Sequence, residues 1–210
     1  AAVLLPFALQ GIARSAVVQD GPFAGLLAGQ GEHQRANAAL AAMAVQLFGN
    51  STIIDQNAIF EGARNVVWPA RMQRLKDGPL TALAPNQEIW LDGGHNPHAA
   101  RAIATQLNNM PGRTALVAAM LASKDATGYF MPFRQVRPEV FPLPNAPGHQ
   151  GAEPQALAEA ATNAGLKAAA YDSLEAALKA AATTGVDRSL ICGSLYLAGE
   201  VLAQNGEPPP

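Results

Sequence analysis

The residues best suited to chemistry in this chain lie together between two predicted secondary-structure elements. Asp92, His95 and Asn96 follow a short apolar run, residues 89–91, and precede an alanine-rich segment with apolar residues at helical spacing. This pattern predicts a strand, a tight polar turn and a helix. Open α/β sheets bind ligands at the carboxyl ends of their strands, where these side chains would stand. The alternative is an ordinary loop in which Asn96 caps the helix and Asp92 only organises the turn.

Other residues offer less for catalysis or metal binding. His95 and His98 are three residues apart, but Pro97 interrupts the helical face that they would share, so a metal site is not expected. Cys192 lies in an apolar run, which favours a small buried hydrophobe over a reactive thiol. Neither the phosphate loop G-x-x-x-x-G-K-[ST] nor the dinucleotide fingerprint G-x-G-x-x-G occurs in the sequence. A phosphate cradle for a nucleotide is therefore expected outside these 210 residues.

Alternating strand and helix patterns surround the turn from residue 72 onward. We expect strands at residues 72–75, 88–91, 114–120, 139–143, 167–171 and 189–192, and helices at 97–108, 127–133, 154–164, 174–183 and 195–203. Ser173 is expected to cap the fourth of these helices, with Glu175 in its first turn. Such alternation with short connections predicts an α/β fold, with a mainly parallel, Rossmann-like sheet flanked by helices.

The first third of the chain has a different pattern. Helices are expected at residues 38–48 and 53–64, whereas the broken apolar patches of residues 1–30 predict no element. Residues 65–72 are expected to be a linker, because Pro69 excludes a central strand. We therefore expect two domains, residues 1–66 and 67–210.

Composition limits the class of protein. The chain is 49% hydrophobic and 14% charged, which is typical of a globular rather than a disordered protein. Its net charge of −2 and its lack of a lysine-arginine block disfavour nucleic acid or an anionic membrane as a partner. No run of 18 apolar residues occurs, and the single cysteine fits a reducing compartment, so the cytoplasm is expected.

Four separated stretches together resemble one family. They are Gly-Glu-His-Gln-Arg-Ala-Asn-Ala at residues 31–38, Trp-Pro-Ala-Arg at 68–71, Leu-Asp-Gly-Gly-His-Asn-Pro-His at 91–98 and Cys-Gly-Ser-Leu-Tyr-Leu-Ala-Gly at 192–199. A fifth, Met-Leu-Ala-Ser-Lys-Asp, occupies residues 120–125. Their order and spacing resemble folylpolyglutamate synthase/dihydrofolate synthase, a relative of the Mur ligases. The family commonly has glycine where this chain has Ala70, and alanine where it has Gly94.

This resemblance implies a Mur-ligase C-terminal domain in residues 67–210, preceded by the end of a central ATPase domain in residues 1–66. It implies ATP-dependent addition of L-glutamate to a folate, and also to dihydropteroate, through an acyl phosphate. ATP and Mg²⁺ are the implied cofactors, with the phosphate loop and the metal ligands outside this chain. A monomer with only small-molecule partners is expected, and the chain alone is expected to be inactive.

Five residues match functional positions of the family. Asn37 and Arg71 are expected to contact the nucleotide, and Arg71 also to assist catalysis through its charge on the phosphates. Asp92 is expected to meet the nucleotide, His95 to position glutamate or the acyl phosphate, and Ser194 to hold the glutamate carboxylate. Structural alternatives remain open: Asn37 as a helix N-cap and Arg71 as a surface or interdomain ion pair.

Two other functions fit the same residues. Because the phosphate loop is missing, the chain is alternatively a non-catalytic nucleotide- or glutamate-binding module. A Mur-type cell-wall amino-acid ligase shares the architecture, but the Gly-Ser-Leu-Tyr of residues 193–196 is not expected there.

Overall fold

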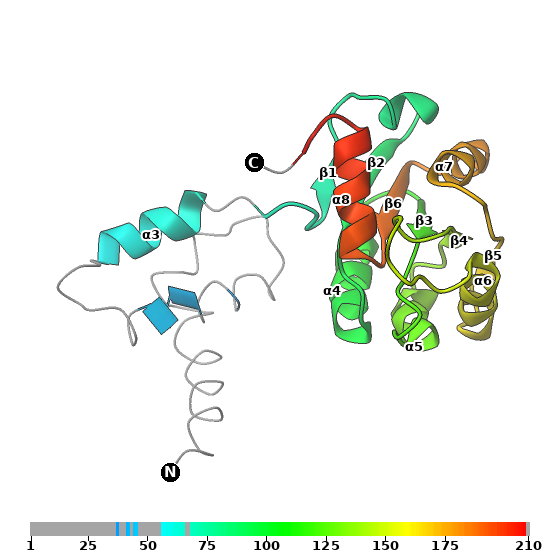
Figure 1. Ribbon diagram of the computed structural model, residues 1–210, viewed down its shortest axis with the longest axis horizontal. Helices are drawn as coiled ribbons and strands as arrows, with labels where there is room; N and C mark the ends of the chain where they lie inside the picture. The colour runs from blue at the N-terminus through cyan, green and yellow to red at the C-terminus, as the bar shows by residue number, and fades with distance from the viewer. Residues whose placement is uncertain (1–36, 38–40, 43, 46–55, 66–67, 209–210) are drawn as a thin grey trace, which may run out of the picture. The chain divides into compact units, whose positions relative to one another are not determined.

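The computed structural model describes residues 37, 41–42, 44–45, 56–65 and 68–208 (Figure 1). The chain divides into two compact units, Ala1–Val67 and Trp68–Pro210. In the first unit, the described residues are helical and include α3, Gln56–Asn65. Most of the predicted helix at 38–48, the start of the one at 53–64, the patches of residues 1–30 and most of the first motif lie outside the described residues. The assignment of residues 1–66 to a central ATPase domain stays a prediction.

The second unit is built on one six-stranded sheet. Its strands are β1 (Gln73–Arg74), β2 (Glu88–Asp92), β3 (Thr114–Ala118), β4 (Glu139–Pro142), β5 (Lys167–Ala168) and β6 (Arg188–Cys192). They lie in the order β1-β2-β6-β3-β4-β5. All neighbours are parallel except β1 and β2. The predicted mainly parallel sheet is confirmed.

Helices cover both faces of this sheet (Figure 1). One face packs against α4 (Pro97–Asn108), α5 (Ala126–Phe130), the 3₁₀ helix η3 (Met131–Arg134) and α6 (Pro154–Asn163). The other packs against the 3₁₀ helix η2 (Thr81–Leu83), α7 (Leu174–Thr183) and α8 (Leu195–Gln204). Along β3, Ala115 and Val117 join the α7/α8 core and Leu116 and Ala118 join the other. Because helices cover both faces, every residue of β3 and β6 is buried.

Local sequence signals placed several helix ends correctly. Asn96 caps α4 and Ser173 caps α7, each by accepting a hydrogen bond from the backbone three residues on, and Glu175 lies in the first turn of α7. The helix expected at residues 127–133 is instead α5 followed by η3, where Pro132 lacks an amide hydrogen. Strand β5 has two regular residues, although hydrogen bonds to β4 continue as far as Tyr171.

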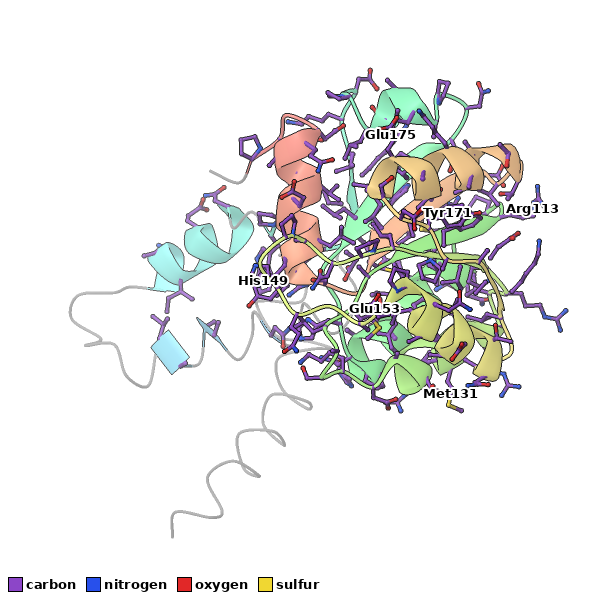
Figure 2. All side chains as sticks on the ribbon, turned by 45° about the vertical axis from the view of Figure 1, so that its right-hand side comes forward. Arg113, Met131, His149, Glu153, Tyr171 and Glu175 are labelled. Carbon is purple, nitrogen blue, oxygen red and sulfur yellow. The ribbon has the colours of Figure 1, made fainter. Side chains whose placement is uncertain are left out.

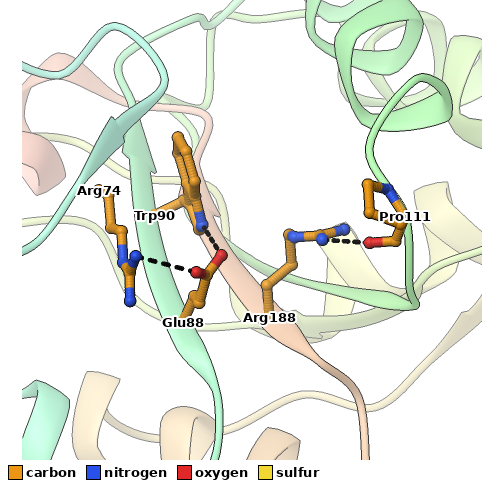
Figure 3. A network of polar contacts seen from close by, with 5 residues as sticks. All are labelled: Arg74, Glu88, Trp90, Pro111 and Arg188. Carbon is orange, nitrogen blue, oxygen red and sulfur yellow. Dashed lines mark hydrogen bonds and ion pairs between the residues drawn. The ribbon is translucent and has the colours of Figure 1, made fainter.

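Polar contacts fix β1 to the edge of the sheet (Figure 3). Glu88 of β2 accepts from Arg74 Nη1 at 3.0 Å and from Trp90 Nε1 at 3.0 Å. On the neighbouring β6, the buried Arg188 donates to the carbonyl of Pro111. Because β1 runs antiparallel to β2, its first residue pairs with Leu91, and the segment before it reaches the carboxyl end of β2.

Across the described residues, no helix is long and apolar enough to cross a membrane.

Candidate functional site

The carboxyl ends of β2 and β6 are a topological switch point. The two strands are paired along their whole length, but β2 leads into α4 on one face of the sheet and β6 leads into α8 on the other. Doubly wound sheets bind ligands where neighbouring strands diverge in this way. The N-termini of α4 and α8 also lie at these strand ends, and the unpaired N–H groups of a helix N-terminus favour anions. We call residues 92–95 and 193–195 the switch point.

Close backbone packing holds the two turns of the switch point together. The amide of Gly193 donates to the carbonyl of Gly94 at 3.1 Å. Gly193 has φ 96°, and a Cβ there would lie 2.4 Å from the carbonyl oxygen of Ala119. A Cβ on Gly93 would lie 2.3 Å from Leu195 Cδ2. Glycine is therefore required at position 193, where the clash is with backbone, whereas at position 93 the exposed side chain of Leu195 could move aside.

The Asp92 carboxylate connects the turn to the segment that precedes β1. Its Oδ2 accepts from the backbone amide of Met72 at 2.9 Å, and its Oδ1 accepts from the amide of Gly94 at 2.7 Å. The residue is only 6% exposed. These contacts make Asp92 a positioning residue. Its predicted contact with a nucleotide stays a prediction.

Left-handed backbone bends the segment that carries Arg71. Ala70 has φ 54° and Met72 has φ 41°, both in the region that favours glycine. The side chain of Gln73 accepts from the amide of Ala70 at 2.9 Å, and the carbonyl of Ala70 accepts from Gly93 at 2.8 Å. The conformation of Ala70 gives a physical reason for glycine at this position in the family. The role of Gln73 had no motif to reveal it.

The Arg71 guanidinium lies over the switch point with most of its donors unused. Its Nη1 lies 3.3 Å from the position that a Cβ on Gly93 would occupy. Among the described residues, its one hydrogen bond is a long contact of 3.5 Å to the carbonyl of Ala70, and it has no ion pair. A guanidinium with free donors is chemically suited to a phosphate or carboxylate.

His95 and Ser194 come from the two turns that meet at the carboxyl ends of β2 and β6. His95 is half-buried, and its Nδ1 lies 3.1 Å from the carbonyl oxygen of Gly93. If Nδ1 carries the proton in this contact, Nε2 is left as an acceptor. Ser194 is 3% exposed and caps α8 by accepting from the amide of Leu197 at 3.3 Å. Among the residues that the structure describes, its hydroxyl hydrogen has no recorded acceptor and could donate to a ligand.

Four of the five predicted site residues therefore lie on the second unit around the switch point: Arg71, Asp92, His95 and Ser194. The fifth, Asn37, is an exposed residue in a helical segment of the first unit. Its predicted nucleotide contact stays a prediction. Within the described part of the chain, no three His, Cys, Asp or Glu side chains gather as metal ligands would.

Two buried side chains lie beneath the switch point. Burial raises the pKa of the Cys192 thiol from 9.0 to about 12; the neighbouring Tyr129 hydroxyl lowers it and the Asp92 charge raises it by lesser amounts. Burial, and then the neighbouring Cys192 and Asp92, also raise the pKa of Tyr129 well above its ordinary value. Both groups are neutral at physiological pH. A buried neutral thiol fits the interpretation of Cys192 as a small hydrophobe.

One contact beside the switch point had no sequence signal. The ring of Tyr196, in the first turn of α8, stacks on the ring of His149, with 3.4 Å between centroids and 16° between planes. His149 comes from the long loop after β4 and lies beside the foot of α8 (Figure 2). The loop is held there by a hydrogen bond from Ala122 to the carbonyl of Gln150 at 3.1 Å. Such a contact joins segments whose proximity only the fold determines.

Comparisons with known proteins agree on one group of relatives. Residues 81–204 match the family described as dihydrofolate synthetase, C-terminal domain. The chain is 31% identical to folylpolyglutamate synthase of Lacticaseibacillus casei, over 81% of this chain and 38% of that protein. It is 29% identical to dihydrofolate synthase/folylpolyglutamate synthase of Escherichia coli strain K12, over 79% of this chain and 37% of that protein.

Solved structures give the same relatives. Mycobacterium tuberculosis folylpolyglutamate synthase complexed with ADP and AMPPCP superposes with a TM-score of 0.70 and 26% identity, over 86% of this chain and 42% of that one. The Yersinia pestis bifunctional folylpolyglutamate synthase/dihydrofolate synthase with Mn, AMPPNP and L-glutamate bound gives a TM-score of 0.63 and 27% identity, over 80% and 38%. The chain spans less than half the length of each of these proteins.

Proposed function

Because the chain belongs to the family of dihydrofolate synthetase C-terminal domains, we propose that it is part of an ATP-dependent ligase that adds L-glutamate to folates. Dihydropteroate is the second acceptor in this proposal, and the acceptor carboxylate reacts as an acyl phosphate. The observation that carries the proposal is the Arg71 guanidinium, which lies beside Gly93 at the switch point with most of its donors unpaired among the described residues. A cytoplasmic monomer that binds only small molecules is part of the same proposal.

The anion-binding half of the site rests on Arg71 and its support. Bound ATP supplies the phosphoryl group that makes the acceptor carboxylate reactive. Arg71 neutralises charge on the phosphates, and its planar fork gives them a fixed direction. Asp92 acts through its bond to Met72, which holds the neighbouring Arg71 over Gly93. Asn37 contacts the nucleotide from the first unit in this proposal, and Mg²⁺ ligands are expected outside this chain.

The glutamate half of the site rests on His95 and Ser194. With Nδ1 donating to the carbonyl of Gly93, the Nε2 of His95 accepts a hydrogen bond from the amine of glutamate and orients it. The hydroxyl of Ser194 donates to a glutamate carboxylate while its oxygen continues to cap α8. The positive end of the α8 dipole adds to this attraction.

A non-catalytic binding module is the second candidate, because the 210 residues contain no phosphate loop. The non-catalytic module predicts the same ligand binding as the ligase and differs from it only in turnover. A Mur-type cell-wall ligase differs in its amino acid, so the choice of amino acid separates it from the first two.

Calorimetric titration with amino acids tests the proposal. In the presence of ADP, the chain is expected to bind L-glutamate in preference to D-glutamate and L-alanine. His95→Ala should lower the affinity for L-glutamate about tenfold or more, which is the usual effect of removing a hydrogen bond to a charged group. The matched control is His98→Ala, because His98 is exposed on α4 three residues further on.

Two results would count against the proposal. One is an absence of L-glutamate binding at roughly 10 mM, a concentration that saturates even weak sites. The other is equal loss of affinity in both histidine variants. Preference for D-glutamate or L-alanine would favour the Mur-type ligase.

A further inference from the structure

A cavity lies at the amino ends of the strands, opposite the switch point. It has a volume of about 510 Å³ and is formed where the chain enters β4 and β5. Its charged lining residues are Arg134, Arg137, Glu139 and Lys167. The switch point lies at the carboxyl ends of the strands and this cavity at their amino ends. We call it the amino-edge pocket.

The amino-edge pocket carries an excess of positive charge. Lys167 Nζ and Glu139 Oε1 form an ion pair of 2.8 Å between the first residues of β5 and β4. Within the described part of the chain, the guanidiniums of Arg134 and Arg137 have neither a hydrogen bond nor an ion pair. Three cations and one carboxylate give a local charge of +2, in a chain whose net charge is −2. This concentration of charge favours an anion.

The backbone around the pocket is specialised at two points. Arg137 has φ 51°, an unfavourable conformation for a residue with a side chain, and its amide donates to the carbonyl of Phe133 at 2.9 Å. Gly165 has φ 81°, and a Cβ there would lie 3.3 Å from Nε of Arg134. The guanidinium of Arg134 therefore lies close against the backbone of Gly165.

Only part of this arrangement has a purely structural explanation. Gly165 follows the end of α6, so Arg134 lies near the negative end of that helix dipole. This accounts for Arg134 alone. The left-handed backbone of Arg137 closes the preceding 3₁₀ helix, because its amide bonds to the carbonyl of Phe133 four residues earlier. The dipole and this cap do not account for the guanidinium of Arg137, which is exposed and has no partner among the described residues.

We propose that the amino-edge pocket binds a phosphate-type dianion, either orthophosphate or the terminal phosphate of a nucleotide. Two unpaired guanidiniums match two negative charges, and their forks match the spacing of phosphate oxygens. The volume is within the range of small-molecule sites, so the pocket has room for a group attached to the phosphate. The proposal does not depend on the ligase function, because it concerns the amino ends of the strands.

Titration of the ¹⁵N-labelled chain tests this proposal. Sodium phosphate is expected to shift the amides of Arg137, Glu139, Gly165 and Lys167 with saturation in the millimolar range or below, whereas sodium chloride at matched ionic strength is not. Arg137→Gly should lower the affinity for phosphate about tenfold or more, because glycine adopts the same backbone conformation but lacks the guanidinium. Arg101→Ala, an exposed arginine on α4, is the matched control and should bind as the unmodified chain does.

A second variant tests the charge balance, and two further ligands identify the source. Glu139→Gln should tighten phosphate binding, because it leaves Lys167 without its carboxylate partner. Tighter binding of AMP or ADP than of phosphate would identify a nucleotide, and equal or weaker binding would identify free phosphate. Unsaturable shifts, equal shifts with chloride, or an unchanged affinity in Arg137→Gly would overturn the proposal.

Discussion

The carboxylate of Asp92 is hydrogen-bonded to the backbone amide of Met72, twenty residues earlier in the chain, at 2.9 Å. This bond holds the segment that carries Arg71 at the carboxyl end of β2. The second carboxylate oxygen holds the turn itself through Gly94. Asp92 therefore serves the candidate site mainly by fixing the position of another charge.

Replacing Asp92 by asparagine should destabilise the fold. The amide nitrogen of asparagine would face one of the two backbone N–H groups that the carboxylate now satisfies, so one buried donor loses its acceptor. A loss of about 1–3 kcal/mol in the free energy of unfolding is expected, measured by urea denaturation. Asp125→Asn is the control, because Asp125 caps α5 through one oxygen and asparagine caps helices equally well. Equal stability of the two variants would contradict the role given to Asp92.

Two glycines with different surroundings should respond oppositely to alanine. Gly193→Ala should cost about 3 kcal/mol or more, because the new Cβ would meet the carbonyl of Ala119 in a left-handed backbone. Gly199→Ala should instead stabilise by about 0.5–1 kcal/mol, since Gly199 is exposed within α8 with open space around it. Thermal unfolding of both variants checks this. A tolerated alanine at 193 would contradict the close packing of the two turns.

Replacing the two serine N-caps distinguishes an effect on stability from an effect on L-glutamate binding. Ser194→Ala and Ser173→Ala each remove a side-chain cap, from α8 and α7, and should each cost about 1 kcal/mol. Of the two, only Ser194 lies at the switch point. Only Ser194→Ala should therefore also lower the affinity for L-glutamate, measured by calorimetry in the presence of ADP. Equal binding by the two variants would leave Ser194 with a capping role alone.

The Cys192 thiol should make stability fall in alkaline solution. Its pKa is about 12 in the folded chain and 9.0 ordinarily, so between these values the unfolded chain loses the proton while the folded chain keeps it. The folded state then binds more protons, and the free energy of unfolding falls as pH rises. Cys192→Ala should show a shallower decline from pH 9 to 12 in urea denaturation. Identical slopes would contradict the burial of the thiol.

Local signals allowed much of the fold to be predicted from sequence. Helix α4 begins and ends where expected, because Asn96 and Pro97 mark its start and the apolar spacing marks its extent. The buried strands were predicted from their apolar runs. The motifs also indicated Arg71 and His95, which the structure places at one edge of the sheet.

What the sequence did not predict depends on partners far apart in the chain. The bond between Asp92 and Met72 and the stacking of His149 on Tyr196 both join segments that only the fold brings together. The left-handed backbone at Ala70 and Met72 was also unexpected, because neither residue type indicates it. Hydrogen bonds to Gln73 and Asp92 hold it in place.

The most direct test of the proposed site is a titration of the ¹⁵N-labelled chain with ADP. We expect saturable shifts at the amides of residues 93–95 and 193–194. Arg71→Ala should abolish them with a change in stability within about 0.5 kcal/mol, because this side chain makes one long hydrogen bond and no ion pair among the described residues. Arg71→Lys should restore only part of the affinity. Arg137→Gly should leave these shifts intact. If ADP leaves the switch point unshifted, or Arg71→Ala binds it as the unmodified chain does, the nucleotide site is not at the carboxyl ends of β2 and β6.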